Sequence, residues 1–248
     1  MFKYPKTFFK SIPPDVVDFI KAETLSCEEN SVDIVLTNTK SVALTGSSVE
    51  SNGCFEETEG DEVGILSCAV GKPIEEWLPT FVHESCHKDQ CVERAACWVD
   101  NYFGDLDSMG LIELWLEKYV ELSPQQKMRY FSASILVELD CEVRSVDKIK
   151  QWNLPIDTDE YIQKSNAYVL FYHIVRLTRQ WYEIGREPYN VHDVWGRMPK
   201  TWMVQSKYTR QPDPALLGII ADGTMGGSAW EETLKMLEKN ELRNRLEL

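Results

Sequence analysis

The chain has 248 residues, of which 43% are hydrophobic, and a formal net charge of -14 at pH 7. This length can bury a sizeable core, as one large domain or two small lobes, and the hydrophobic content is ordinary for a globular protein. The acidic balance argues against binding to a phosphate backbone, which needs a basic surface, so we expect no nucleic-acid partner. No segment approaches the roughly 18 apolar residues of a membrane span, so no membrane association is expected.

The N-terminal residues and the cysteines bear on the compartment. The first ten residues include lysines but no apolar run long enough for a signal peptide. The seven cysteines are an odd number. An odd count without a secretion signal is typical of reduced thiols in a reducing compartment. We therefore expect a soluble, cytoplasmic protein, and the sequence leaves its oligomeric state open.

The sequence of residues 1–107 predicts a small lobe that contains strands. A short helix is expected first, and it is followed by several short apolar segments separated by polar turns, a pattern typical of strands. Gly71-Lys72-Pro73 interrupts the chain, and a helix over about 74–89 begins near Pro73 or Ile74. The early helix is expected at 14–26, and the strands at 32–36, 41–44, 54–56 and 62–70.

From residue 108 the pattern is almost wholly helical. One helix is indicated over 111–122. Ser123-Pro124-Gln125-Gln126 fits a capping box with proline at the first helical position, and an apolar stripe extends that helix to about Gln151. Further helices are expected at about 157–182 and 228–246, with a loop-rich stretch between them. The predicted fold class is α+β and mainly helical, with a strand-containing lobe (1–107) and a helical lobe (108–248) in one compact catalytic unit.

The segment His83-Glu84-Ser85-Cys86-His87 places two histidines four residues apart on the predicted helix over 74–89. Positions i and i+4 lie on the same helix face, so both imidazoles can bind one Zn²⁺ at about 2.0–2.1 Å. Glu84 is rotated by about 100° around the helix axis, and from there it can reach a metal-bound water without being a ligand. The alternative is a buried helix whose histidines bond core partners, but it would leave the carboxylate between them buried without a charge partner.

A catalytic zinc needs a third protein ligand and an open position for water. The predicted helix over 124–151 contains Glu138 and Glu142, which are i,i+4 neighbours beside its apolar stripe. Carboxylates on the core side of a helix need a compensating charge, which a divalent metal would supply. The spacing of the residues leaves open whether Glu138 or Glu142 binds the metal.

With these two motifs the chain resembles the gluzincin type of zinc metallopeptidase. In that family His-Glu-x-x-His is followed some tens of residues later by a helix carrying Glu-x-x-x-Asp, and residues 138–142 match this with Glu in the last place. The resemblance covers about residues 62–145. It implies a zincin-like fold with a small twisted mixed sheet, Glu138 as the third ligand, and Glu142 as the carboxylate that orients a ligand histidine. It also implies that the strand at 62–70 is the edge strand along which an extended peptide lies. The chain departs from the family pattern at Lys88 and Asp89, where the family usually has an uncharged residue and then an apolar one.

These residues predict a mechanism for the hydrolysis of a peptide or protein substrate. Zn²⁺ would lower the pKa of its bound water towards about 7 and polarise a carbonyl oxygen. Glu84 would be the general base, taking the water proton and later delivering it to the leaving amine. The developing oxyanion needs another donor, for which Tyr189 and His192 are candidates in the loop after the long helices, unless both simply pack there. His173 lies mid-helix among apolar neighbours and is expected to be a core histidine.

Two function classes therefore remain. The leading hypothesis is a zinc-dependent metallohydrolase, most simply a peptidase. The second is a catalytically silent zincin-like protein with a structural or interaction role in a larger assembly, for example a phage-encoded component. In that case a fourth protein ligand would close the metal site. A thiolate site built from Cys86, Cys91 and Cys97 fits no common zinc spacing.

Overall fold

The structure is a computed structural model that describes residues 12–43, 50–58, 64–183 and 185–225. Contacts divide the chain into two units, one made of residues 1–99 and 140–158 and the other of residues 100–139 and 159–248. The division falls within the helix α5 (Pro124–Gln151), so one continuous helix contributes residues to both units.

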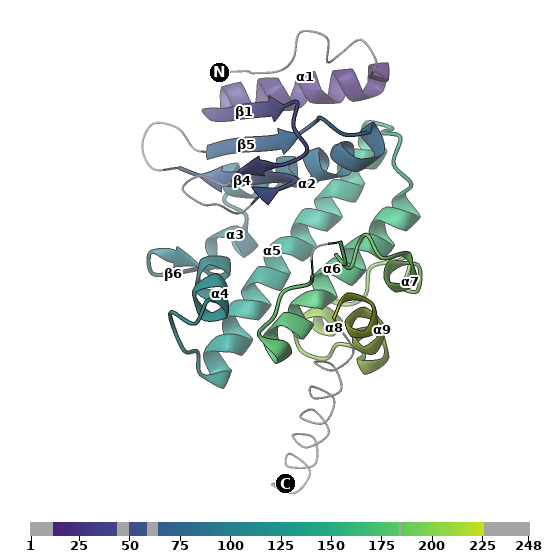
Figure 1. Cartoon of the computed structure of the whole chain (residues 1–248). Coiled ribbons are helices and arrows are strands. Elements are labelled where there is room, and N and C mark those ends of the chain that lie inside the picture. Colours follow the sequence, from purple (N-terminus) through teal and green to yellow (C-terminus); the bar gives the residue numbers. More distant parts are fainter. Residues whose placement is uncertain (1–11, 44–49, 59–63, 184, 226–248) are drawn as a thin grey trace, which may run out of the picture. The chain divides into compact units, whose positions relative to one another are not determined.

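The first unit is built on a mixed three-stranded sheet in the order β1 (Val32–Thr37), β5 (Gly64–Ala69) and β4 (Gly53–Glu57). β1 runs parallel to β5, and β4 runs antiparallel to it. The helix α1 (Pro14–Glu29) lies along β1, and α2 (Ile74–Val92) packs against β5 and β4 (Figure 1). The shorter elements of this unit are β2 (Val42–Ala43), β3 (Glu50–Ser51) and α3 (Ala96–Val99).

The position of β5 corrects one expectation. The strand at 62–70 was predicted to be an edge strand, but β5 pairs on both sides and is the central strand of its sheet. Its burial is consistent with this position, because Leu66 and Cys68 are fully buried on one face and Ala69 is fully buried on the other. Among the described residues, the edges of this sheet are β1 and β4.

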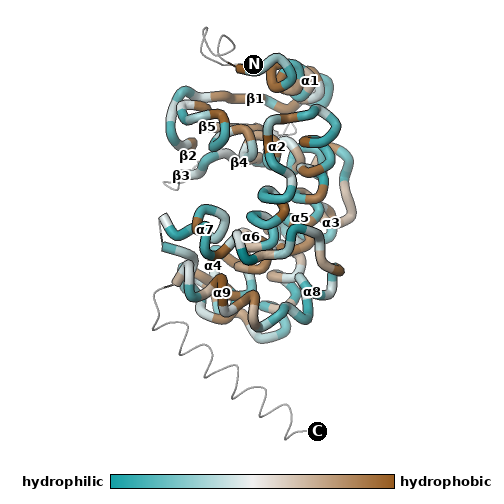
Figure 2. Tube along the Cα trace, turned by 90° about the vertical axis from the view of Figure 1, so that its right-hand side faces the viewer, coloured by the Kyte–Doolittle hydropathy of each residue, from teal (hydrophilic) through white to brown (hydrophobic). Residues whose placement is uncertain are grey.

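The helix α1 forms where the sequence predicts it and extends to Glu29. Proline occupies its first turn, where the missing N–H costs nothing. Its buried positions recur every three or four residues, which gives one apolar face towards the sheet. Figure 2 shows both hydrophilic and hydrophobic colours along this helix, as expected of an amphipathic one.

The second unit is mainly helical. Its core lies around α6, which is buried almost continuously from Ala167 to Val175. A helix buried all round is the centre of its unit, and the other helices pack around its apolar surface. The rings of Trp115 and Phe131 meet edge to face in this core, with centroids 5.9 Å apart. Its elements are β6 (Tyr102–Phe103), β7 (Leu106–Asp107), α4 (Ser108–Leu116), the first part of α5, α6 (Thr158–Thr178), α7 (His192–Trp195), α8 (Gln205–Thr209) and α9 (Pro214–Thr224).

The mainly helical α+β class is confirmed, and α5 has the predicted bounds. Two other helices end earlier than expected, α4 at Leu116 and α6 at Thr178. In both cases a residue just beyond the end, Lys118 or Arg179, has a positive φ, which turns the backbone out of the helix. The terminal helix predicted at 228–246 lies outside the described residues. No helix in the described part of the chain is long and apolar enough to cross a membrane.

Candidate metal centre

The helix α2 positions both histidines of the motif. It begins after Pro73, and Glu75 and Glu76 place negative charge in its first turn, which complements the helix dipole. Phe81 and Val82 in the middle of the helix are fully buried, and Phe81 packs edge to face on Phe19 of α1. This anchoring fixes the orientation of the next turn, which carries His83 and His87.

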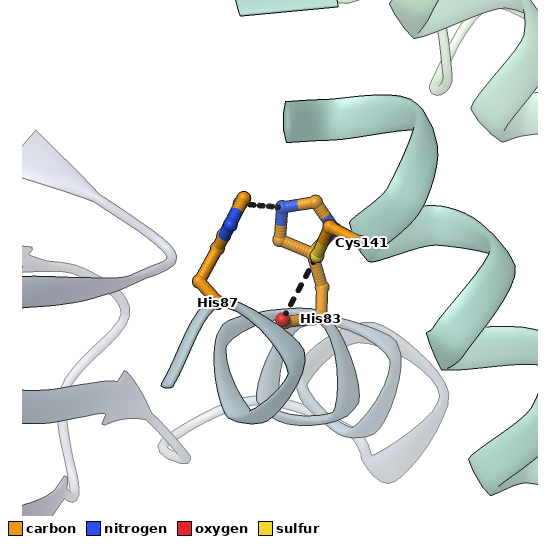
Figure 3. Close-up of side chains that lie close together, drawn as sticks. All are labelled: His83, His87 and Cys141. Carbon is orange, nitrogen blue, oxygen red and sulfur yellow. Dashed lines mark hydrogen bonds between the residues drawn. The ribbon is translucent and has the colours of Figure 1, made fainter. Parts of the chain in front are cut away.

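His83 and His87 face each other through one nitrogen each. Their Nε2 atoms are 3.1 Å apart, and the rings are nearly perpendicular, with centroids 4.6 Å apart (Figure 3). Two nitrogens bound to one tetrahedral zinc at about 2.0–2.1 Å lie roughly 3.3 Å from each other. The observed separation of the two nitrogens is close to that value.

The other ring nitrogen of His83 lies between two side chains of α5. Its Nδ1 is 3.4 Å from Oε1 of Glu142 and 3.5 Å from Sγ of Cys141. The Cys141 thiol also donates to the backbone oxygen of His83, at 3.2 Å. Figure 3 places Cys141 at the opposite side of the His83 ring from His87. Among the described residues, His83, His87 and Cys141 form a group that could hold a metal ion, with ligand atoms within 4.8 Å of one another.

The other ring nitrogen of His87 faces an amide. Nδ1 of His87 lies 2.8 Å from Oε1 of Gln90, which is three residues further along α2. The indole of Trp98 packs near the His87 ring, with centroids 6.0 Å apart. His83 and His87 are therefore each contacted through Nδ1 by a neighbouring side chain.

Glu84 lies on the sheet side of α2, next to β4. A Cβ atom placed on Gly53 would lie 3.1 Å from Cγ of Glu84 and 2.8 Å from the methyl group of Thr80. Glycine at this position therefore lets the helix approach β4 closely. Glu84 is also near two thiols: burial raises the pKa of Cys54 to about 12 and that of Cys68 further, and the Glu84 carboxylate adds to both shifts.

Glu138 lies on the part of α5 that belongs to the second unit, and it is not a member of the group of three residues that could hold an ion. The Tyr172 hydroxyl donates to its Oε1 at 3.0 Å, and the hydroxyl groups of Tyr168 and Tyr172 are 3.4 Å apart. Burial raises the pKa of both tyrosines, and the Glu138 carboxylate raises it further. The carboxylate is therefore held by a neutral phenol.

The two candidate oxyanion donors have different surroundings. The Tyr189 ring packs against Tyr168, with centroids 5.8 Å apart, and burial raises the pKa of its hydroxyl. His192 is exposed at the start of α7, and its ring packs on Trp195 in the same short helix. His173 is a buried core histidine, as expected: it bonds the Tyr208 carbonyl oxygen, and burial with nearby Arg176 lowers its pKa to about 4.

Lys88 and Asp89, which depart from the gluzincin pattern, belong to a buried ring of charges. Lys88 Nζ lies 3.0 Å from Glu23 and 2.5 Å from Asp89, and Lys148 Nζ lies 2.6 Å from Glu23 and 2.7 Å from Asp89. Burial opposes charge on Lys88, but Glu23 and Asp89 outweigh it and raise its pKa. Two positive and two negative groups therefore balance within one closed ring.

Two residues of this centre were not anticipated from the sequence. Cys141 stands between Glu138 and Glu142, the two residues of this stretch that the sequence predicts as the third ligand and as the carboxylate that orients a ligand histidine. Gln90 follows His87 by three residues, a spacing that places both on one helix face and could have identified it. None of the seven cysteines forms a disulfide, and Cys86, Cys91 and Cys97 do not join the group that could hold an ion.

Comparison with protein-family models, with curated proteins and with solved structures gave no match to this chain. Its function is therefore inferred from the geometry of its own residues.

Proposed function

We propose that the chain is a zinc-dependent metallohydrolase, most simply a peptidase of the gluzincin type with a zincin-like fold. The observation that carries this proposal is the facing pair of Nε2 atoms of His83 and His87, 3.1 Å apart, with Glu84 beside them on α2. An enzyme of this kind needs two imidazoles on one helix face and a carboxylate next to them that is not a ligand.

The surroundings of the two rings fit a divalent ion. With an ion held at Nε2, Nδ1 of His83 would carry the hydrogen and could donate it to Oε1 of Glu142, 3.4 Å away. The Gln90 oxygen is likewise an acceptor for Nδ1 of His87. Each Nε2 then carries a lone pair, and both lone pairs point into the same gap. Two lone pairs that face each other repel, and a proton or a metal ion between the nitrogens would remove this repulsion. Neutral imidazole nitrogens are common zinc ligands.

Glu138 is our choice for the third ligand. Glu142 lies beside Nδ1 of His83, which is the place of a carboxylate that orients a ligand histidine. Glu138 lies one turn earlier on the same face of α5, because i and i+4 positions are stacked along a helix. Its bond from Tyr172 would fix the carboxylate orientation without neutralising its charge.

The bound ion would supply Lewis acidity that polarises a substrate carbonyl and acidifies water. Glu84 would take the proton from the attacking water and return it to the leaving amine. For the oxyanion we favour Tyr189 over His192. The Tyr189 ring packs on Tyr168, and the Tyr168 hydroxyl contacts that of Tyr172, which donates to Glu138. An extended peptide would lie along the edge strand β4, where Gly53 leaves the backbone close to Glu84.

A second candidate function is a silent structural or interaction protein. The observation that favours it is Cys141, whose thiol forms a group with the two histidines in which the possible ligand atoms lie within 4.8 Å of one another. A thiolate ligand added to two histidines and a glutamate would close the coordination sphere and exclude the water that hydrolysis needs. The two functions therefore differ in whether sulfur binds the metal.

Two measurements test the proposal. In the first, peptide hydrolysis and zinc content are compared between the wild type and Glu84→Gln, which keeps the shape of the side chain but removes the base. We expect hydrolysis to fall by at least about 100-fold while zinc content stays the same. Wild-type hydrolysis that is unchanged by Glu84→Gln would refute the peptidase proposal.

The second measurement is the absorption spectrum of the Co²⁺-substituted protein. A thiolate ligand gives an intense sulfur-to-cobalt band in the near ultraviolet, whereas nitrogen and oxygen ligands do not. We expect no such band, and the same spectrum from Cys141→Ser. A strong band that disappears in Cys141→Ser would favour the closed, structural site.

A further inference from the structure

A buried amide next to the histidine pair contacts one of the two rings. Gln90 is completely shielded from solvent and lies three residues after His87 on α2. Its Oε1 is 2.8 Å from Nδ1 of His87. A glutamine can accept a hydrogen bond through its oxygen or donate through its nitrogen, so the orientation of this amide decides which nitrogen of His87 carries hydrogen.

The other partners of Gln90 fix its orientation. Its Nε2 donates to Oδ2 of Asp140 at 2.8 Å and lies 3.6 Å from Sγ of Cys97. A carboxylate oxygen only accepts, so the amide nitrogen must face Asp140 and the amide oxygen must face His87. The reversed amide would bring two oxygen acceptors against each other inside the protein, which is costly.

Asp140 is itself held in place. Nε of Arg144 lies 2.6 Å from Oδ2 of Asp140, and Nη1 of Arg144 lies 2.7 Å from Glu93. Because arginine does not lose its proton in proteins, Nε of Arg144 always donates to Asp140, and Oδ2 of Asp140 accepts from both Arg144 and the Gln90 amide. A continuous chain of contacts therefore leads from Glu93 through Arg144, Asp140 and Gln90 to His87, all within the first unit.

We propose that Gln90 is a positioning residue that fixes His87 as the tautomer with hydrogen on Nδ1. Since Oε1 of Gln90 only accepts, Nδ1 of His87 donates, and Nε2 then presents its lone pair towards His83. The benefit of fixing this tautomer rests on the proposed metal function, in which Nε2 of His87 is a ligand. The tautomer, however, is a property of the metal-free protein as well.

His83 faces two side chains of different chemistry. Its Nδ1 faces the Glu142 carboxylate, which accepts, and the Cys141 thiol, which can donate or accept. Because Nε2 of His87 then carries a lone pair, the 3.1 Å contact between the two Nε2 atoms in the metal-free protein needs a hydrogen on Nε2 of His83. A metal held at Nε2 would require His83 to carry that hydrogen on Nδ1 instead, where Glu142 would accept it, with no net change in protons. One histidine is fixed and the other adapts.

The tautomer of His87 is measured directly by long-range ¹H–¹⁵N correlation spectra of the imidazoles in metal-free protein, assigned with His87→Asn. The wild type is expected to show Nδ1 protonated and Nε2 unprotonated. Gln90→Met keeps the shape of the side chain but removes the acceptor, so we expect hydrogen to appear on Nε2 of His87. Gln163→Met is the matched control, because Gln163 is a buried glutamine of α6 that bonds the carbonyl oxygens of Gly196 and Met198.

Zinc affinity gives the second readout. Losing the partner that orients a ligand histidine typically weakens metal binding by about 10–100-fold, and we expect this for Gln90→Met but not for Gln163→Met. An unchanged His87 tautomer in Gln90→Met, or an Nε2-protonated His87 in the wild type, would overturn the proposal. A wild type that binds no zinc but shows the predicted change of tautomer would refute the metal function and leave the positioning role intact.

Discussion

The helix α2 carries two groups of polar side chains that differ in how their charges and hydrogen bonds are balanced. On one side Lys88 and Asp89 join Glu23 and Lys148 in a closed ring of four charges, in which each positive group contacts both negative groups. On the other side His83 and His87 direct Nε2 atoms at each other across 3.1 Å. The first arrangement is complete within the protein. In the proposed metal site a cation would complete the second, and this difference separates a structural group from a candidate site.

The charge ring is expected to give the largest effect on stability. Lys88→Met leaves Glu23 and Asp89 sharing Lys148 alone, and breaking a buried ion pair from one side costs about 3–5 kcal/mol. Chemical denaturation should show this loss. Lys21→Met is the control, because Lys21 forms an exposed pair with Asp18 and should change stability by less than about 1 kcal/mol. Equal effects of the two substitutions would mean that the ring is not a structural element.

His173 provides a reference for a histidine with a purely structural role. Burial lowers its pKa to about 4, so between pH 6.5 and 4 the unfolded chain binds a proton that the folded chain does not. Its contribution to stability is therefore complete above pH 6.5 and is lost as the pH falls towards 4, by about 3 kcal/mol in total. His173→Gln can still donate to the Tyr208 carbonyl oxygen but does not titrate. Thermal unfolding across this pH range should show a steeper decline for the wild type, and parallel declines would contradict the assignment.

The close approach of α2 to β4 is tested at Gly53. Gly53→Ala would force Thr80 and Glu84 to move, and overpacking of this kind costs about 1–3 kcal/mol. We also expect peptide hydrolysis to fall while zinc stays bound, because the displaced group is the proposed base and not a ligand. Gly218→Ala in α9 is the control, since a side chain there meets nothing within 4 Å and alanine favours a helix. Zinc loss together with activity in Gly53→Ala would contradict this role for Glu84.

Cys141 should have the smallest effect if it lies behind His83 and does not bind the metal. Cys141→Ser retains a donor for the His83 carbonyl oxygen, so we expect zinc affinity to change by less than about tenfold, or 1.4 kcal/mol. Competition with a chromophoric chelator measures this. A loss larger than about 100-fold would make the sulfur a ligand and favour the structural function.

The sequence predicted the parts of this molecule that depend on local signals. The proline and capping residues at 123–126 defined the start of α5, and the apolar stripe defined its end at Gln151. The order of the strands was not predictable in the same way, because it depends on pairing between distant segments. The placement of β5 as an edge strand was therefore wrong, although its apolar composition favoured a central position.

The candidate site was only partly visible in the sequence for a similar reason. The i,i+4 spacing of His83 and His87 follows from helix geometry alone. The partners at their Nδ1 atoms depend on how α5 packs against α2 in the first unit, and Cys141 and Asp140 gained their roles from that packing. In the sequence, Lys88 and Asp89 are only a departure from a family pattern. In the structure they form ion pairs with Glu23 and Lys148, which lie far from them in the sequence.

The most direct test of the central claim is the zinc content of the purified wild type, measured by inductively coupled plasma mass spectrometry beside a His83→Asn/His87→Asn double variant. If the two Nε2 atoms hold one ion, the wild type should contain about one zinc per chain and the double variant almost none. A folded wild type that takes up no zinc, even when zinc is supplied, would show that the facing imidazoles share only a proton and would contradict the metal site.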